Sequence, residues 1–130
     1  MQKIHTFLMF DGQAEEAMNF YVSLFPNSEV LTLAHYGPEG PGAEGTVMHA
    51  AFTLNGQEYM CIDSNIKHDF TFTPAISLYV NCSSEEEIDT LYAKLAEGGG
   101  ALMPLGSYGF SRKFGWVVDR FGVAWQLNFA

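Results

Sequence analysis

Basic residues are scarce in this chain of 130 residues. Six lysines and arginines stand against 15 aspartates and glutamates, which gives a formal net charge of -9. Proteins that bind nucleic acid neutralise phosphates with clustered lysine and arginine side chains, and the sequence has no such cluster. The densest acidic run, Glu85 to Glu87, is typical of the first turn of a helix. The composition therefore argues against a nucleic-acid partner.

Cysteine and long apolar runs are also scarce. The two cysteines, Cys61 and Cys82, have no histidine or basic neighbour in the sequence that would mark a catalytic thiol. No apolar stretch has the length of a signal sequence or of a membrane-spanning helix. We therefore expect a cytoplasmic protein with reduced thiols and no membrane partner.

Apolar and aromatic residues are abundant. They make up 48% and 15% of the chain, enough to bury the core of a single domain without disulfides or metals. The surplus of aromatic side chains suits a concave ligand site and a subunit interface equally well. Both interpretations stay open from composition alone.

The chain contains an internal repeat. A constant offset of 70 aligns Thr6–Phe25 with Ile76–Leu95 without a gap, and it matches Met18 with Ile88. Both segments have the pattern of a strand, a turn and a helix. The repeat predicts two copies of one structural module.

Each of the two helices has recognisable ends. The first is expected to begin after Asp11, a residue that favours the N-cap position, and to end at Pro26. The second is expected to end at the glycines that follow Glu97. Two capping-box spacings compete for its start, which are Ser83 with Glu86 and Ser84 with Glu87.

Three strands are predicted after each helix, so each module has the order β-α-β-β-β and the fold class is α+β. The predicted strands are Val30–Tyr36, Thr46–Leu54, Glu58–Asp63, Ala101–Pro104, Gly115–Val118 and Val123–Phe129. The first module spans residues 1–66, an ordered crossing segment spans 67–74, and the second module spans 75–130. Residues 37–45, rich in glycine and proline, are expected to form a long mobile loop.

Alternation along the strands assigns the two faces of each sheet. The two-residue turn Asn55-Gly56 pairs Phe52 with Tyr59 and Ala51 with Met60. The residues assigned to the core are Met48, Ala50, Phe52, Leu54, Tyr59, Cys61, Ile76, Leu78, Val80, Trp116, Trp125, Leu127 and Phe129. The opposite face is mixed polar and apolar, as expected of a pocket wall.

Two segments carry a family resemblance. These are Phe-Tyr-Val-Ser-Leu-Phe-Pro-Asn-Ser at 20–28 and Phe-Gly-Trp-Val-Val-Asp-Arg-Phe-Gly-Val-Ala-Trp-Gln-Leu at 114–127. They resemble the vicinal oxygen chelate superfamily of glyoxalase, bleomycin-resistance and extradiol dioxygenase proteins, in its PhnB-like branch. The resemblance implies a glyoxalase-like fold, in which two modules form an open, curved mixed sheet around a pocket, and it implies a homodimer.

Metal-using members of that superfamily take ligands from the first and last strands of each module. The residues at those positions here are His5, Ala75, Met60 and Gln126. Only His5 is a good ligand, so no metal is favoured; His5, His49 and Gln126 are weak candidates for a divalent ion. Relatives in this branch often carry the name 3-demethylubiquinone 3-methyltransferase, but the chain has no glycine-rich strand-to-helix turn for S-adenosylmethionine.

The predicted function is small-molecule binding without a cofactor, with an organic and, given two basic residues in one loop, anionic ligand. The predicted pocket residues are His5, Phe7, His49, Glu58, Met60, Ser77, Tyr79, Tyr108, Arg112, Gln126 and Asn128. One alternative is a metal-assisted lyase, isomerase or dioxygenase that uses His5 with His49 and Gln126. Another is a structural homodimer with a vestigial pocket.

Overall fold

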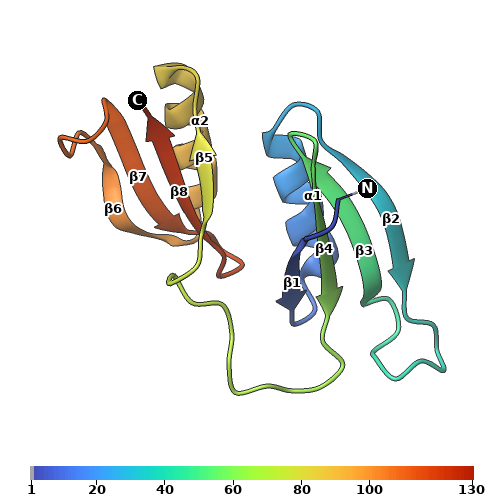
Figure 1. The fold of residues 1–130 in the computed structure, drawn as a ribbon. Coiled ribbons are helices and arrows are strands. Elements are labelled where there is room, and N and C mark those ends of the chain that lie inside the picture. Colours follow the sequence, from blue (N-terminus) through green and yellow to red (C-terminus); the bar gives the residue numbers. More distant parts are fainter. Residues whose placement is uncertain (1) are drawn as a thin grey trace. The chain divides into compact units, whose positions relative to one another are not determined.

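The computed structural model describes residues 2–130 and divides the chain into two compact units. The first unit ends at His68, and the second comprises Asp69–Ala130. Each unit contains one four-stranded mixed sheet and one helix that lies along one face of that sheet (Figure 1). No helix within residues 2–130 has both the length and the apolar character needed to cross a membrane.

The first unit has the predicted order of elements. They are β1 (Thr6–Phe10), α1 (Ala14–Leu24), β2 (Glu29–His35), β3 (Val47–Leu54) and β4 (Gln57–Asp63). The strands lie in the order β1-β4-β3-β2, with β1 parallel to β4 and the other pairs antiparallel. Because a parallel pair needs a crossover, α1 and the β2-β3 hairpin lie between the two partners in sequence.

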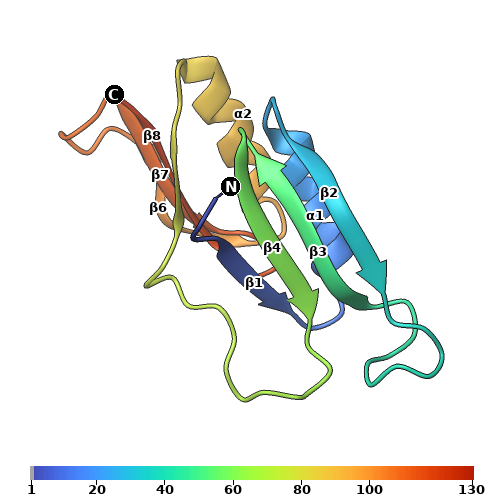
Figure 2. The ribbon, with the colours of Figure 1, turned by 45° about the vertical axis from the view of Figure 1, so that its right-hand side comes forward.

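The second unit repeats this arrangement. Its elements are β5 (Leu78–Asn81), α2 (Glu85–Ala96), β6 (Gly100–Gly106), β7 (Lys113–Val118) and β8 (Ala124–Phe129). The strand order β5-β8-β7-β6, with β5 parallel to β8, corresponds strand for strand to the first unit (Figure 1). Figure 2 shows the order β1-β4-β3-β2 in the sheet of the first unit. The predicted α+β class and the repeated β-α-β-β-β module are confirmed.

The face of each sheet that touches its helix forms a core. In the first unit the predicted pairing of Phe52 with Tyr59 and of Ala51 with Met60 is confirmed. The assignment of Met48 to this core is wrong, because its side chain is 47% exposed. A register irregularity opposite Ala34 and His35 interrupts the alternation at Met48 and brings Val47 into the core instead.

The core assignments in the second unit are right for the last strand and wrong for two other residues. Trp125 and Leu127 are buried as predicted, whereas Ile76 precedes β5 and is 73% exposed. Trp116 pairs with Gln126, on the face turned away from α2. The face of β7 toward the helix is filled at Gly115 by Tyr92, since a Cβ atom there would lie 2.9 Å from the Tyr92 ring.

The pairing of the strands also corrects the alignment of the repeats. Thr6 pairs with Tyr59 and Leu78 pairs with Trp125. Tyr59 and Trp125 are the positions that match when the two hairpins are aligned on Gly56 and Gly122, so Thr6 corresponds to Leu78 and the offset of the first strands is 78 − 6 = 72. His5 therefore corresponds to Ser77, and the predicted match with Ala75 is wrong.

The helix starts are stabilised in two different ways. At α1 the predicted cap Asp11 is replaced by Asp63, whose Oδ1 accepts hydrogen bonds of 2.9 Å from the backbone N–H groups of Gly12 and Ala14. At α2 the N-cap is Ser84, whose hydroxyl accepts from the Glu87 N–H at 3.1 Å. This decides between the two capping-box spacings in favour of Ser84 with Glu87.

The glycine-rich segment between β2 and β3 is a hydrogen-bonded loop folded around one aromatic ring. The Gly45 N–H donates to the Tyr36 carbonyl at 3.0 Å, and the Tyr36 N–H donates to the Thr46 carbonyl at 2.9 Å. A Cβ atom on Gly42 would lie 2.4 Å from the Tyr36 ring. Glycine at position 42 thus allows the backbone to approach the ring this closely.

Both cysteines are buried. Burial raises the pKa of the Cys61 thiol to about 12, and the nearby Asp63 carboxylate adds to the shift. Burial likewise raises the pKa of Cys82 to about 11, with the charge of Glu87 adding to it and a backbone hydrogen bond at Asn128 opposing it. Both thiols are therefore protonated near neutral pH.

We predict that replacing Asp63 with asparagine lowers the free energy of unfolding by about 3 kcal/mol, since buried N–H groups lose a charged acceptor. Asp63 is 3% exposed, and its Oδ2 also accepts from the Val47 N–H at 2.9 Å. Urea unfolding followed by far-UV circular dichroism measures the change. Asp11→Asn is the matched control and should change stability by less than about 0.5 kcal/mol; an equal loss in both variants would contradict the assignment of Asp63.

We also predict that the folded protein resists a disulfide-exchange reagent at pH 8. The raised pKa values leave roughly one thiol in ten thousand ionised at Cys61 and roughly one in a thousand at Cys82. Absorbance of the released thiolate from 5,5′-dithiobis(2-nitrobenzoate) should rise only slowly in buffer and promptly in urea, where both thiols react. Rapid reaction of either thiol in the folded protein would show that it is activated.

Candidate functional site

The predicted pocket residues from the strands lie on the faces of the sheets that are turned away from the helices, here called the far faces. The far face of the first sheet carries His5, Phe7, His49, Glu58 and Met60. The far face of the second sheet carries Ser77, Tyr79, Gln126 and Asn128. The two far faces differ in chemistry, since the first contains imidazole and carboxylate side chains and the second does not.

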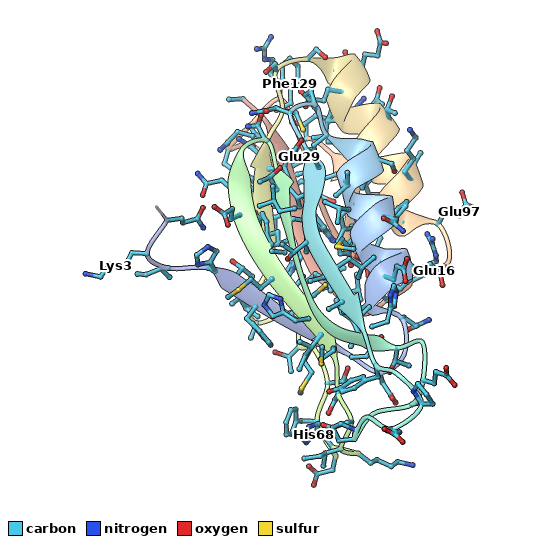
Figure 3. The ribbon with its side chains drawn as sticks, turned by 90° about the vertical axis from the view of Figure 1, so that its right-hand side faces the viewer. Lys3, Glu16, Glu29, His68, Glu97 and Phe129 are labelled. Carbon is cyan, nitrogen blue, oxygen red and sulfur yellow. The ribbon has the colours of Figure 1, made fainter. Side chains whose placement is uncertain are left out.

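In the first unit, His5 and Glu58 form a pair. His5 directly precedes β1 and lies opposite Glu58 in β4, and its Nε2 is 3.5 Å from Glu58 Oε1. The side-chain amide of Gln2 pins the segment before β1 to β4, because it donates to the Glu58 carbonyl at 3.0 Å and accepts from the Glu58 N–H at 2.9 Å. Figure 3 shows the neighbouring Lys3 extending away from the sheet.

His49 does not join this pair. It pairs with Ala34 and lies two strands from β1, next to Ile62 of β4, whereas His5 lies opposite Glu58. Four strand positions and two strand spacings separate the two histidine backbones by about 13 Å along and about 10 Å across the strands. Two side chains that rise from a sheet at this separation cannot bind one ion.

The corrected alignment gives the donor set at the expected metal positions. His5 now corresponds to Ser77 in place of Ala75, and Met60 still corresponds to Gln126, so the four positions offer an imidazole, a hydroxyl, a thioether and an amide. Glu58, which lies beside His5, corresponds to Ala124 in the second unit. Within residues 2–130 no group of three histidine, cysteine or acidic side chains is placed to hold a metal ion. A stable divalent site takes three or four such ligands, and these residues do not fit one.

In the second unit, the far face combines amides with aromatic rings. Gln126 Nε2 donates to Ser77 Oγ at 2.8 Å. Phe114 is 3% exposed and is the centre of a ring cluster, with centroid distances of 6.4 Å to Tyr79, 6.3 Å to Tyr108 and 4.9 Å to Phe110. The Tyr108 hydroxyl donates to the Pro104 carbonyl, which fixes this ring over the sheet.

Two buried polar atoms on this face have no hydrogen-bond partner among residues 2–130. They are the indole Nε1 of Trp116, in β7, and the amide Oδ1 of Asn128, in β8. The sequence pattern predicted Trp116 in the core, so Trp116 was not among the predicted site residues. The signal that could have revealed it is Gly115, whose lack of a side chain leaves room on the helix side for Tyr92.

The basic residues next to the ring cluster are engaged elsewhere. Lys113 Nζ binds Glu85 Oε2 at 2.8 Å and Asp89 Oδ1 at 2.7 Å, both on α2. Hydrogen bonds to these carboxylates raise the pKa of Lys113, and the bond to Asp89 contributes most. The Arg112 guanidinium lies 4.2 Å from the centroid of the Phe129 ring, and its Nε donates to the Ala130 carbonyl at 2.7 Å.

The chain is similar to proteins of known sequence and structure. A family model for 3-demethylubiquinone-9 3-methyltransferase matches residues 2–128. A PhnB protein from Bacillus cereus is 67% identical, with 99% of this chain and 100% of that chain covered and a TM-score of 0.98. Among curated proteins none matches this sequence.

Two more distant structures share the fold. A glyoxylase/bleomycin resistance protein/dioxygenase domain from Frankia sp. EAN1pec is 14% identical, with 100% of this chain and 98% of that chain covered and a TM-score of 0.66. The fosfomycin resistance protein FosX from Listeria monocytogenes is 12% identical, with 100% and 93% covered and a TM-score of 0.61. These two structures show a shared fold. The chain belongs to the 3-demethylubiquinone-9 3-methyltransferase family, as the match over residues 2–128 and the 67% identical PhnB protein show.

Proposed function

We propose that this protein binds a small organic molecule on the far face of the second sheet, and that binding without a metal is its function. The observation that carries the proposal is the pair of buried, unpartnered polar atoms beside the ring cluster, Trp116 Nε1 and Asn128 Oδ1. Ligand sites are mostly apolar and aromatic, with a few polar groups that set the orientation of the ligand. This face has that composition.

The free-energy cost of the two unpartnered atoms favours a ligand on the far face of the second sheet. A buried donor or acceptor without a partner costs about 1–3 kcal/mol, because it has lost its hydrogen bonds to water. A ligand that pairs with both atoms recovers that free energy. Tyr79 adds a ring that is 53% exposed and therefore available for stacking.

Methyl transfer is not supported by the residues present. The helix N-termini that could face the charged groups of S-adenosylmethionine are already occupied by the chain itself. The first is capped by the Asp63 carboxylate and the second by the Ser84 hydroxyl. The family description therefore gives a name for the relatives and no reaction for these residues.

A second candidate function is acid-base chemistry at the His5–Glu58 pair. The observation in its favour is the distance of 3.5 Å between His5 Nε2 and Glu58 Oε1, in a segment that Gln2 fixes by two hydrogen bonds. A carboxylate that orients an imidazole is a common arrangement for proton transfer. This candidate places the substrate on the first unit, whereas the favoured candidate places it on the second.

We predict that Tyr79→Ala weakens the binding of uncharged bicyclic aromatic compounds about tenfold, since one aromatic contact contributes about 1–1.5 kcal/mol. A thermal-shift screen selects compounds, and isothermal titration calorimetry measures their affinity for the variant and for the unaltered protein. Phe20→Ala, which removes a ring from α1 in the first unit, is the matched control and should bind normally. A loss of binding in His5→Ala with none in Tyr79→Ala would favour the second candidate, and no shift with any compound class would contradict both.

A further inference from the structure

We infer that the ligand of the second far face is uncharged and carries a hydrogen-bond acceptor next to a donor, as in a cyclic amide fused to an aromatic ring. This inference rests on the proposed function and specifies its ligand class. It follows from the charge of the face, from the polarity of its two unpartnered atoms and from the position of the ring cluster.

The face itself carries no charge. Its residues in β5, β7 and β8 are Tyr79, Asn81, Phe114, Trp116, Val118, Ala124, Gln126 and Asn128. The two basic residues that precede or begin β7 are bound elsewhere, Arg112 at Phe129 and Lys113 at Glu85 and Asp89. An ion on this face would lose its hydration without gaining a counter-charge, which is expensive. The anionic ligand expected from the sequence is therefore not the class we propose.

The two unpartnered atoms have opposite roles. An indole Nε1–H can only donate and an amide Oδ1 can only accept a hydrogen bond. Trp116 pairs with Gln126, and Phe114 pairs with Asn128, so Trp116 and Asn128 are diagonal neighbours on adjacent strands, with their Cα atoms about 7–8 Å apart. They do not bond to each other. A group that offers C=O to Trp116 and N–H to Asn128 spans this diagonal.

A cyclic amide has this pattern, because its ring fixes the C=O and N–H groups on the same side. A carboxylate offers two acceptors and no donor, so it would leave its second oxygen against Asn128 Oδ1. The neighbouring amide of Gln126 already donates to Ser77 Oγ, so it does not pair with either of the two atoms. The aromatic body of the ligand would extend toward Tyr79, which pairs with Gln126 in the next strand.

Three small probes separate these features. They are 2-quinolone, which has adjacent C=O and N–H groups, N-methyl-2-quinolone, which lacks the donor, and quinoline-2-carboxylate, which is an anion of similar size. Calorimetric titration of the full chain should show 2-quinolone binding at least about tenfold more tightly than either of the others. Equal or tighter binding of the carboxylate or of the N-methyl compound, or no binding of 2-quinolone, would overturn the inference.

Two conservative variants assign the contacts. Trp116→Phe keeps an aromatic ring and removes the N–H donor, and Asn128→Leu keeps the approximate shape and removes the acceptor. Each should weaken 2-quinolone about tenfold, and Asn128→Leu should bind 2-quinolone and its N-methyl derivative equally, because the donor on the ligand then has no partner. Asn65→Leu, an exposed amide in the first unit, is the control and should leave affinity unchanged.

The outcomes distinguish the inference from the proposed function. If the carboxylate binds best and Tyr79→Ala weakens it, the site is real and the ligand class is wrong. If 2-quinolone binds with the same affinity to Trp116→Phe, Asn128→Leu and the unaltered protein, the two atoms do not contact it and the inference fails. If no compound of any class depends on Tyr79, the proposed site fails with it.

Discussion

The parallel pairing of the first and last strands in each unit determines where the candidate residues of those strands lie. In the first unit it aligns Thr6 with Tyr59, and in the second it aligns Leu78 with Trp125. A shift of this register by one residue would move each candidate side chain to the opposite face of its sheet. The helices and the hairpins follow from this constraint, since they must connect two strands that run in the same direction.

The same scaffold supports different chemistry in its two copies. The far face of the first unit presents the pair His5 and Glu58, and the corresponding positions of the second unit hold Ser77 and Ala124. The far face of the second unit instead presents amides and aromatic rings, with two buried polar atoms that lack partners among residues 2–130. The repeat is therefore preserved in its strand order and pairing, whereas the chemistry of its far faces differs.

Local sequence signals predicted those parts of the fold that local interactions determine. The turn Asn55-Gly56 gave the right pairs across its hairpin, because a two-residue loop fixes the register of both strands. Alternation failed at Met48, where a bulge reverses the faces, and at Trp116, where Tyr92 fills the helix side beside Gly115. The capping of α1 by Asp63 joins residues 49 and 51 positions apart, so no local pattern could predict it.

Part of the candidate site could also be predicted, because regular alternation along a strand assigns each side chain to one face. Tyr79, Gln126 and Asn128 were identified by alternation in strands whose faces are regular. The match of His5 with Ala75 failed because one constant offset, read mainly from the helices, does not hold for the first strands. Trp116 is placed on the far face by its pairing with Gln126, and the sequence signal for that placement is the neighbouring Gly115.

We propose that Trp116 Nε1 donates a hydrogen bond to the ligand. Nuclear magnetic resonance of nitrogen-15-labelled protein tests it directly, since the chain has two indole N–H signals and Trp125 Nε1 already donates to Asp119 Oδ2 at 2.9 Å. Addition of an uncharged aromatic cyclic amide should shift the Trp116 indole signal downfield and slow its hydrogen exchange, with the Trp125 signal unchanged. Amide shifts confined to residues around His5 and Glu58, with both indole signals unmoved, would contradict the account.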